Sequence, residues 1–255
     1  MLTLADLVRT HPGFAVPTQY CVGKRFGESM VCFHNFYSEI FRGADTPVTL
    51  YLCYFDQAGV QRATQTREID GGEAVQIAAS EAGFTDPGLV TVVAIPRFDL
   101  GALAKDKIKL RGDIGTGFYM IWHDAVGHVD TMHEWMPVRR VGIVKGRYYF
   151  VLNPPDSRII RNGLVLMNPT LDPSARVQAR VRVYTARRKV LGTAVLPLVP
   201  PMGSNLVYFD EVLPQIGSWM QAHGSLGVEL HGNNVIEPLT VEIHRSGDFH
   251  LHHIN

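Results

Sequence analysis

Hydrophobic and polar residues alternate along residues 164–210, a stretch that predicts four short strands joined by three turns. Within residues 177–184 small apolar side chains fill every second position. A period of two places one set on a buried face of a strand and the other on its polar face. Residues 190–198 predict a partner strand, which ends at Pro200 because proline cannot donate to a ladder. The polar face of the first strand carries Gln178, Arg180, Arg182 and Tyr184.

The same plan occurs earlier in the chain, over residues 30–77. Residues 48–55 predict a strand, residues 56–59 a turn, and residues 60–69 the returning strand. Gly71 and Gly72 then close this hairpin. The hydrophobic pattern therefore predicts one β module that is used twice.

The two copies match at individual positions. Tyr54 and Tyr184 are each followed by valine six residues later, and Asn35 and Asn168 each close the strand before the hairpin. The offset between these pairs is close to half the chain length, as a tandem duplication would give. The alternative is that two unrelated β-hairpins share the same simple pattern.

The remaining pattern is one of many short strands with Pro- and Gly-containing turns, which is typical of all-β sandwiches. We predict two tandem β-sandwich modules, residues 29–136 and 137–255, arising from an internal duplication. Residues 1–28 are interpreted as an N-terminal arm that covers a sheet edge or a neighbouring subunit. Short helices are expected only at the N-terminus, capped by Thr3, and near residues 210–222.

The composition of the chain bears on its partners and on its compartment. Lys and Arg together equal Asp and Glu together at 24 each, so no global electrostatic field favours nucleic acid, and we do not expect a nucleic-acid partner. No run reaches the roughly 18 apolar residues of a membrane span. The first ten residues lack a basic start and a long apolar core, which predicts a cytoplasmic protein unless a leader was removed. The three cysteines are interpreted as small buried residues of a reducing compartment.

Histidine is the enriched reactive residue, with two clusters that each follow an apolar strand. His250 and His252 are two apart in a predicted strand, so both rings leave the same face. That spacing suits a divalent transition metal such as zinc, with a third histidine or a nearby carboxylate completing the shell. The alternative is a set of surface or interface histidines. Further candidate ligands are His244, His123, His128 and His133, with Asp124, Asp130, Glu134 and Asp248 as the carboxylates.

The polar stripe of Arg180, Arg182 and Tyr184 is the second candidate site. Guanidinium groups beside an aromatic ring can grip a phosphate, a carboxylate or a single strand of nucleic acid. The alternative is the solvated face of an amphipathic strand. The chain has no P-loop, no dinucleotide fingerprint and no GxSxG elbow.

Residues 31–99 resemble the sensory rhodopsin transducer family. The resemblance rests on VCFHN, VTLYLCYFDQAGV, GGEAVQI and VTVVAIPRFD, read in that order. Arg97 and Asp99 occupy the place of an R-x-D motif in that family. The family's early aromatic-glycine motif is missing, and the duplication is a further departure. The resemblance implies a cytoplasmic, oligomeric β-sandwich that binds a partner or a small ligand.

These observations lead to two hypotheses of different classes. The first is a non-enzymatic binding or assembly protein, forming a homo-oligomer and recognising a partner protein or a small ligand. The second is a metal-dependent enzyme, a hydrolase or an oxygenase, that uses the pair His250 and His252 with His244 or a histidine of the first half as a further ligand.

Overall fold

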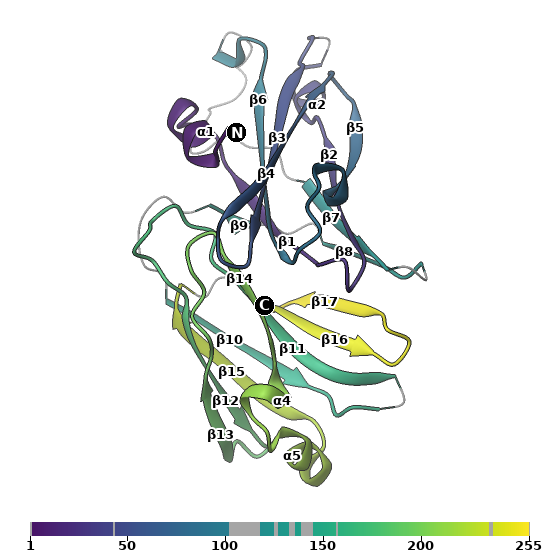
Figure 1. Ribbon diagram of the computed structural model, residues 1–255, viewed down its shortest axis with the longest axis vertical. Coiled ribbons are helices and arrows are strands. Elements are labelled where there is room, and N and C mark those ends of the chain that lie inside the picture. Colours follow the sequence, from purple (N-terminus) through teal and green to yellow (C-terminus); the bar gives the residue numbers. More distant parts are fainter. Residues whose placement is uncertain are drawn as a thin grey trace. The chain divides into compact units, whose positions relative to one another are not determined.

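The computed structural model describes residues 2–42, 44–101, 118–124, 127–132, 136–138, 145–156, 158–234 and 237–254. Their contacts divide the chain into two units (Figure 1). The first unit comprises Met1–Asp56, Val60–His123 and Thr131–Val138. The second comprises Gln57–Gly59, Asp124–Asp130 and Arg139–Asn255. Residues 124–130, placed in the first module from the sequence, therefore group with the second unit.

The first unit holds two antiparallel sheets. One has the order β4 (Gln61–Ile69), β3 (Val48–Asp56), β6 (Gly88–Pro96), β1 (Pro17–Cys21) and β9 (Met136–Pro137). The other has the order β5 (Ala74–Ala78), β2 (Glu28–His34), β7 (Phe118–His123) and β8 (Val129–Met132). Its described helices include α1 (Leu4–Thr10), α2 (Tyr37–Ile40) and the 3-10 helix η1 (Ala79–Ala82).

The second unit also holds two antiparallel sheets. One has the order β10 (Lys145–Leu152), β15 (Leu226–Asn233), β12 (Gln178–Tyr184) and β13 (Val190–Val195). The other has the order β14 (Ser204–Tyr208), β11 (Ile159–Met167), β16 (Leu239–His244) and β17 (Phe249–His253). The helices are α4 (Phe209–Val212) and α5 (Ile216–His223).

The core of the second unit lies between its two sheets. Alternate residues of β12, Ala179, Val181 and Val183, are buried in one hydrophobic cluster with Leu164 and Leu166 of β11. This is the inward set that the period-two pattern predicts, and the polar residues between them leave the opposite face of the sheet. The predicted all-β sandwich is confirmed.

The two units have the same strand order. The series β4-β3-β6-β1 of the first unit corresponds in chain order to β13-β12-β15-β10 of the second. The series β5-β2-β7-β8 corresponds in the same way to β14-β11-β16-β17. The short helix η1 follows β5, as α4 follows β14. An identical order through eight strands is the arrangement expected of a repeated module.

Asn35 and Asn168 hold equivalent places in the two units, and both are fully buried. The Asn35 side-chain amide donates to the carbonyls of Thr46 and Asp70 at 2.7 and 3.0 Å. The amide of Asn168 donates to the carbonyls of Ala175 and Val199, both at 3.1 Å. Each asparagine therefore ties the end of one strand to two flanking loops.

The alignment of Tyr54 with Tyr184, however, is wrong by one residue. Both hairpins contain a β-bulge, which places Phe55 opposite Gln61 and Tyr184 opposite Val190. Phe55 is thus the counterpart of Tyr184, while Tyr54 matches the inward Val183. A one-residue shift turns each side chain to the other face of a sheet, so this correction changes which residues are compared.

Residues 1–28 are not a separate arm. Helix α1 begins after Thr3, whose hydroxyl accepts from the Asp6 backbone in a capping box, as a sequence-level N-cap predicts. The following strand β1 lies inside the five-stranded sheet, between β6 and β9, and all five of its residues are buried. Two further short helices, α2 and η1, fall outside the predicted positions. No described helix is long and apolar enough to cross a membrane.

Candidate functional site

The outward face of β10, β15 and β12 carries the predicted arginine stripe. Cross-strand pairing sets Tyr149 opposite Glu229 and Glu229 opposite Arg182. The adjacent row sets Arg147 opposite His231 and His231 opposite Arg180. The next row brings Val151, Gly227 and Tyr184 together. We call this set the arginine–tyrosine face, and its members are Arg147, Tyr149, Val151, Arg180, Arg182, Tyr184, Glu229 and His231.

Glu229 is the centre of this face, and it is only 3% exposed. The Arg147 guanidinium contacts its Oε1 at 2.5 Å, and Arg182 lies 3.7 Å from its Oε2. The hydroxyl of Tyr184 donates to the same Oε2. The Tyr184 hydrogen bond and, after it, the guanidinium of Arg147 outweigh burial and hold the pKa of Glu229 below its ordinary value. Glu229 is therefore an ionised carboxylate that orders the basic and aromatic side chains around it.

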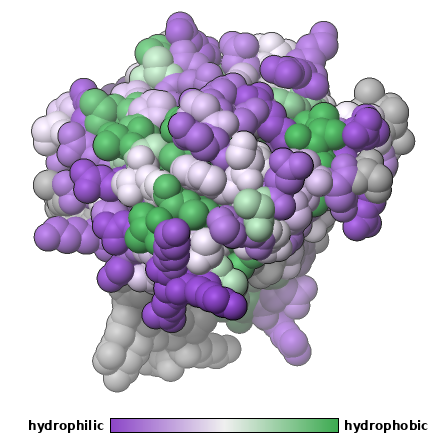
Figure 2. Space-filling view, turned by 90° about the horizontal axis from the view of Figure 1, so that it is seen from below, coloured by the Kyte–Doolittle hydropathy of each residue, from purple (hydrophilic) through white to green (hydrophobic). Residues whose placement is uncertain are grey.

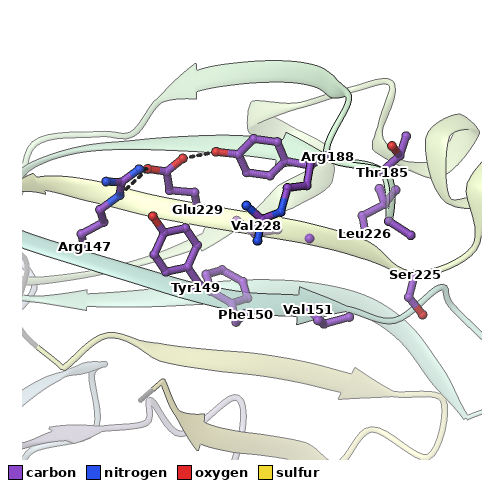
Figure 3. Close-up of a pocket in the computed structure, with 13 residues that line it drawn as sticks. Arg147, Tyr149, Phe150, Val151, Thr185, Arg188, Ser225, Leu226, Val228 and Glu229 are labelled. Carbon is purple, nitrogen blue, oxygen red and sulfur yellow. Dashed lines mark hydrogen bonds and ion pairs between the residues drawn. The ribbon is translucent and has the colours of Figure 1, made fainter.

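A pocket of about 620 Å³ lies beside Glu229 (Figure 3). Its size falls within the range of about 300–1,000 Å³ that small-ligand sites occupy. Arg188 lines it from the turn between β12 and β13, where its φ of 59° is left-handed, an uncommon backbone for a residue with a side chain. The other polar and aromatic lining residues include Arg147, Tyr149, Tyr184, Thr185 and Ser225.

Large apolar side chains are exposed on the same face. Tyr149 is 55% and Val151 62% exposed on β10, while Val190 and Val195 are exposed on β13. In the view of Figure 2, exposed apolar groups are small and are separated by polar side chains, which is the usual arrangement on a protein surface. Exposed aromatic and apolar residues combined with arginine are the composition of binding interfaces.

The matching face of the first unit has no such chemistry. With Phe55 aligned to Tyr184, the positions of Arg182 and Glu229 are taken by Cys53 and Thr91. Thr18 of β1 takes the position of Tyr149. All three of these first-unit residues are fully buried. The charges of the arginine–tyrosine face are therefore not a requirement of the module itself.

Arg97 and Asp99 lie just after β6 in the first unit, and both are exposed. The guanidinium of Arg97 contacts the Glu68 carboxylate at 2.8 Å, and its backbone N–H donates to the carbonyl of Pro47. An exposed ion pair of this kind contributes little to stability. The structure thus gives Arg97 a partner on β4, and the predicted role of Arg97 in ligand binding stays a prediction.

The second candidate site is the hairpin of β16 and β17. Residues 242, 244, 248, 250 and 252 share one face of this hairpin, because successive strand residues alternate between faces. It is the face of the sheet that also carries Leu164, since Leu164 pairs with Thr240 and Thr240 pairs with His252. The opposite face buries Val241, Phe249 and Leu251. The tight turn is closed by the N–H of His244, which donates to the Asp248 carbonyl at 2.9 Å. This turn brings His244, Asp248 and His250 together.

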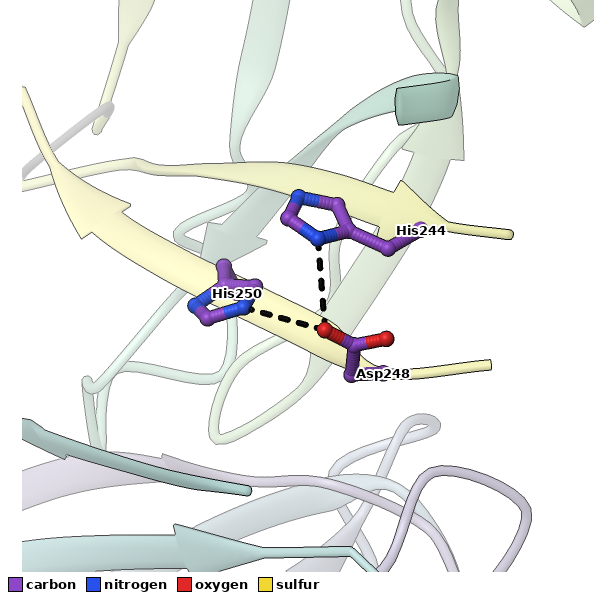
Figure 4. Close-up of side chains that lie close together, drawn as sticks. All are labelled: His244, Asp248 and His250. Atoms are coloured by element: carbon purple, nitrogen blue, oxygen red, sulfur yellow. Dashed lines mark ion pairs between the residues drawn. The ribbon is translucent and has the colours of Figure 1, made fainter. Parts of the chain in front are cut away.

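The three side chains present one ligand atom each, all within 4.8 Å of one another (Figure 4). Asp248 Oδ2 lies 3.2 Å from His244 Nδ1 and 3.4 Å from His250 Nε2. The Asp248 side chain is only 7% exposed. Although its burial acts in the opposite direction, its own backbone N–H and the imidazoles of His128 and His244 hold the pKa of Asp248 below its ordinary value.

The other predicted histidines have different places. His252 is not a member of the trio, because it lies two residues farther along β17, where its ring stacks on His250. His128 Nδ1 lies 3.8 Å from Asp248 Oδ2 but contacts Asp124 at 2.8 Å. His123 ends β7 in the first unit, where it pairs with Glu28. His133 and Glu134 lie outside the described residues.

Sequence reasoning missed the importance of two carboxylates. Glu229 stands 45 residues from its partner Tyr184, and nothing local marks it as their centre. Asp248 was only one of four nearby carboxylates, although its spacing of two from His250 places it on the same strand face. That period-two relation was the signal available for it.

The cysteines carry no site among the described residues. Cys21 and Cys53 are buried and free, and Cys32 is partly buried and free. Burial raises the pKa of the Cys53 thiol to about 11 and that of Cys21 still further. Because the thiolate is the nucleophile and the metal ligand, thiols of this kind are inert.

Comparisons with known proteins do not place the chain in a family. No protein-family model matches it, and no curated protein matches it. Among solved structures it is similar to a lectin from Pleurotus ostreatus, both in complex with GalNAc and in the apo form. Each match has 10% identity and a TM-score of 0.19, and covers 95% of this chain and 76% of the lectin chain. A TM-score this low carries no argument about fold or ligand.

Proposed function

We propose that this chain is a non-enzymatic binding protein that recognises a partner protein through the arginine–tyrosine face of its second unit. The observation that carries the proposal is an exposed sheet face that combines Tyr149 and Val151 with the guanidinium groups around Glu229. The resemblance of residues 31–99 to the sensory rhodopsin transducer family implies the same class of function. Tandem duplication would have supplied a second sheet that was free to acquire this role.

The charge of the face indicates an acidic partner segment. Lys145, Arg147, Arg180, Arg182 and Arg188 gather around a single described carboxylate, Glu229. Arg180 and Arg188 have no ion pair within the described part of the chain. Guanidinium groups bind carboxylates through paired, charge-assisted hydrogen bonds. An acidic side chain flanked by apolar residues would thus meet both halves of the surface.

The position of β10 at the edge of its sheet favours a polypeptide as the ligand over a small molecule. Strand β10 is at the end of the order β10-β15-β12-β13, and its exposed residues alternate along eight positions. A strand at the end of a sheet can take an extended peptide as a further strand, with alternate side chains meeting the sheet face. A second copy of this chain is one possible donor of that peptide, which connects binding with the predicted homo-oligomer.

The experiment is selection of a random peptide library on the purified, tag-free protein, followed by affinity measurement by fluorescence anisotropy. We expect selected peptides to carry Asp or Glu beside apolar residues and to bind less tightly as salt rises, since exposed charge pairs are screened. The double variant Arg180→Glu, Arg188→Glu should weaken binding at least about tenfold, because each reversal turns an attraction into a repulsion.

Lys24→Glu is the matched control, since it reverses one exposed charge in the first unit. It should leave peptide affinity unchanged. Light scattering on the same samples reports whether a second copy is the partner. The proposal fails if the arginine variant and the Lys24 variant select the same peptides with the same affinity, or if the protein neither selects peptides nor associates with itself.

A further inference from the structure

One face of the β16–β17 hairpin carries a set of polar side chains that the arginine–tyrosine face does not use. We infer that His244, Asp248 and His250 form a binding site for one divalent transition-metal ion of the zinc class. The site lies on the sheet β14-β11-β16-β17, and the proposed partner surface lies on the other sheet of the unit. The two proposals therefore rest on different residues and stand or fall separately.

The spacing of the ligand atoms fits a small tetrahedral ion. Zinc binds imidazole nitrogen and carboxylate oxygen at about 2.0–2.2 Å, so neighbouring ligands of a tetrahedron stand about 3.3–3.5 Å apart. Asp248 Oδ2 lies 3.2 Å from His244 Nδ1 and 3.4 Å from His250 Nε2. The separation of the two imidazole nitrogens is within 4.8 Å, and rotation of the partly exposed His250 ring would close it.

The surrounding groups orient two of these ligands. His244 Nδ1 faces Asp248, while its Nε2 is buried without a hydrogen-bond partner and lies 3.6 Å from a carboxylate oxygen of Glu242. A metal-bound histidine usually donates its other ring N–H to a carboxylate, which fixes the tautomer. The second oxygen of Asp248 accepts from the Ser246 hydroxyl, which leaves Oδ2 directed at the imidazoles.

The donor set defines the class of ion. Two neutral imidazoles and one carboxylate suit zinc, iron, nickel or copper in the divalent state, and they disfavour calcium and magnesium, which prefer oxygen. Three protein ligands leave at least one coordination position for water, as in zinc sites that perform chemistry. His250 is 31% exposed, so the site is open to an incoming ion from solvent.

The first experiment is titration of the tag-free, chelator-treated protein with Zn²⁺ by calorimetry and with Co²⁺ by visible absorption. We expect one ion per chain and a Co²⁺ spectrum of low coordination number. Asp248→Asn keeps the shape of the side chain and should weaken affinity at least about 100-fold. Glu242→Gln should weaken it by about 10–100-fold, the effect of losing a group that orients a ligand.

His252→Gln separates this site from adventitious binding to exposed histidines. Its affinity should stay within about threefold of wild type, and His223→Gln on α5 is a control away from the hairpin. Loss of binding in His252→Gln together with normal binding in Asp248→Asn would overturn the assignment, as would a wild-type protein that binds no ion. His250→Gln, at a partly exposed position, is the second test should Asp248→Asn fail to fold.

Discussion

At the scale of single residues, the two buried asparagines show how a side chain can specify a loop. Asn35 and Asn168 each donate two hydrogen bonds to loop carbonyls inside the protein. Replacement of Asn168 by alanine removes both donors, so the buried Ala175 carbonyl loses this hydrogen bond, while the Val199 carbonyl still accepts from the Val177 N–H. We expect Asn168→Ala to lower the free energy of unfolding by about 1–3 kcal/mol, measured by urea denaturation.

Asn168→Asp tests the cause, because it keeps the size of the side chain and removes the NH₂ donor. It should destabilise at least as much as alanine. Asn233→Ala is the control, since Asn233 is partly exposed at the end of β15. Equal urea midpoints for Asn168→Ala and Asn233→Ala would show that the buried amide is dispensable.

Glu229 is a second single residue with a testable effect, because it makes the stability of the folded protein depend on pH. The Tyr184 hydroxyl and the Arg147 guanidinium, against the effect of burial, hold its pKa in the folded state below the ordinary value of about 4.3. The stabilisation is therefore complete above that value and is lost as pH falls through the lower, folded-state pKa. Glu229→Gln removes this contribution, so the stability gap between wild type and variant should be widest near neutral pH.

Urea denaturation of both proteins between neutral pH and about pH 3 would measure that gap. A difference that stays constant or widens on acidification would contradict the network. Gln keeps the size of the side chain, so the comparison isolates the charge. Arg182 and Arg147 would then face each other without a carboxylate between them, which adds repulsion to the loss.

At the scale of elements, periodicity was a sound guide to strands. The alternation over residues 177–184 predicted β12 and its inward set, and the bounds of β16 and β17 follow the same signal. The period-two pattern cannot identify a strand in which apolar and polar residues do not alternate. Strand β1 is buried on both faces and shows no period-two pattern, so its sequence predicts part of an N-terminal arm instead of a strand.

Candidate sites were predictable only where one element carries them. Arg180, Arg182 and Tyr184 share a strand face by spacing alone, and the structure places them together. Glu229 reaches them from β15 through sheet order, a long-range feature that propensity does not encode. Spacing alone predicts the pair His250 and His252, whereas the turn at Gly247, with a φ of 94°, sets His244 and Asp248 beside His250. The geometry of the turn, and not the spacing along one strand, therefore brings His244, Asp248 and His250 together.

At the scale of the whole molecule, one strand plan serves two units with different surfaces. The positions of Arg182, Glu229 and Tyr149 in the second unit are Cys53, Thr91 and Thr18 in the first. Inward positions stay apolar in both, since a shared core demands it. Outward positions of this sheet are free to differ, and the arginine–tyrosine face of the second unit occupies them.

This arrangement predicts that the second unit folds alone. Its two sheets enclose a hydrophobic cluster that draws on β10, β11, β12, β14 and β15, and every member of that cluster belongs to the second unit. A fragment of residues 124–255 should unfold in a single cooperative urea transition and give dispersed amide signals in an NMR spectrum. It retains both proposed sites and should bind Zn²⁺ and the selected peptides with affinities close to those of the full chain.

The fragment lacks residues 57–59, which group with the second unit and contribute the Gln57 carbonyl that accepts from the Ser204 backbone at 3.3 Å. Loss of this hydrogen bond should cost about 0.5–1.5 kcal/mol and leave the fold intact. A fragment that is unfolded, beside a full chain that is stable, would mean that the two units form one cooperative structure. A folded fragment that binds neither zinc nor peptide would place both activities in the complete chain.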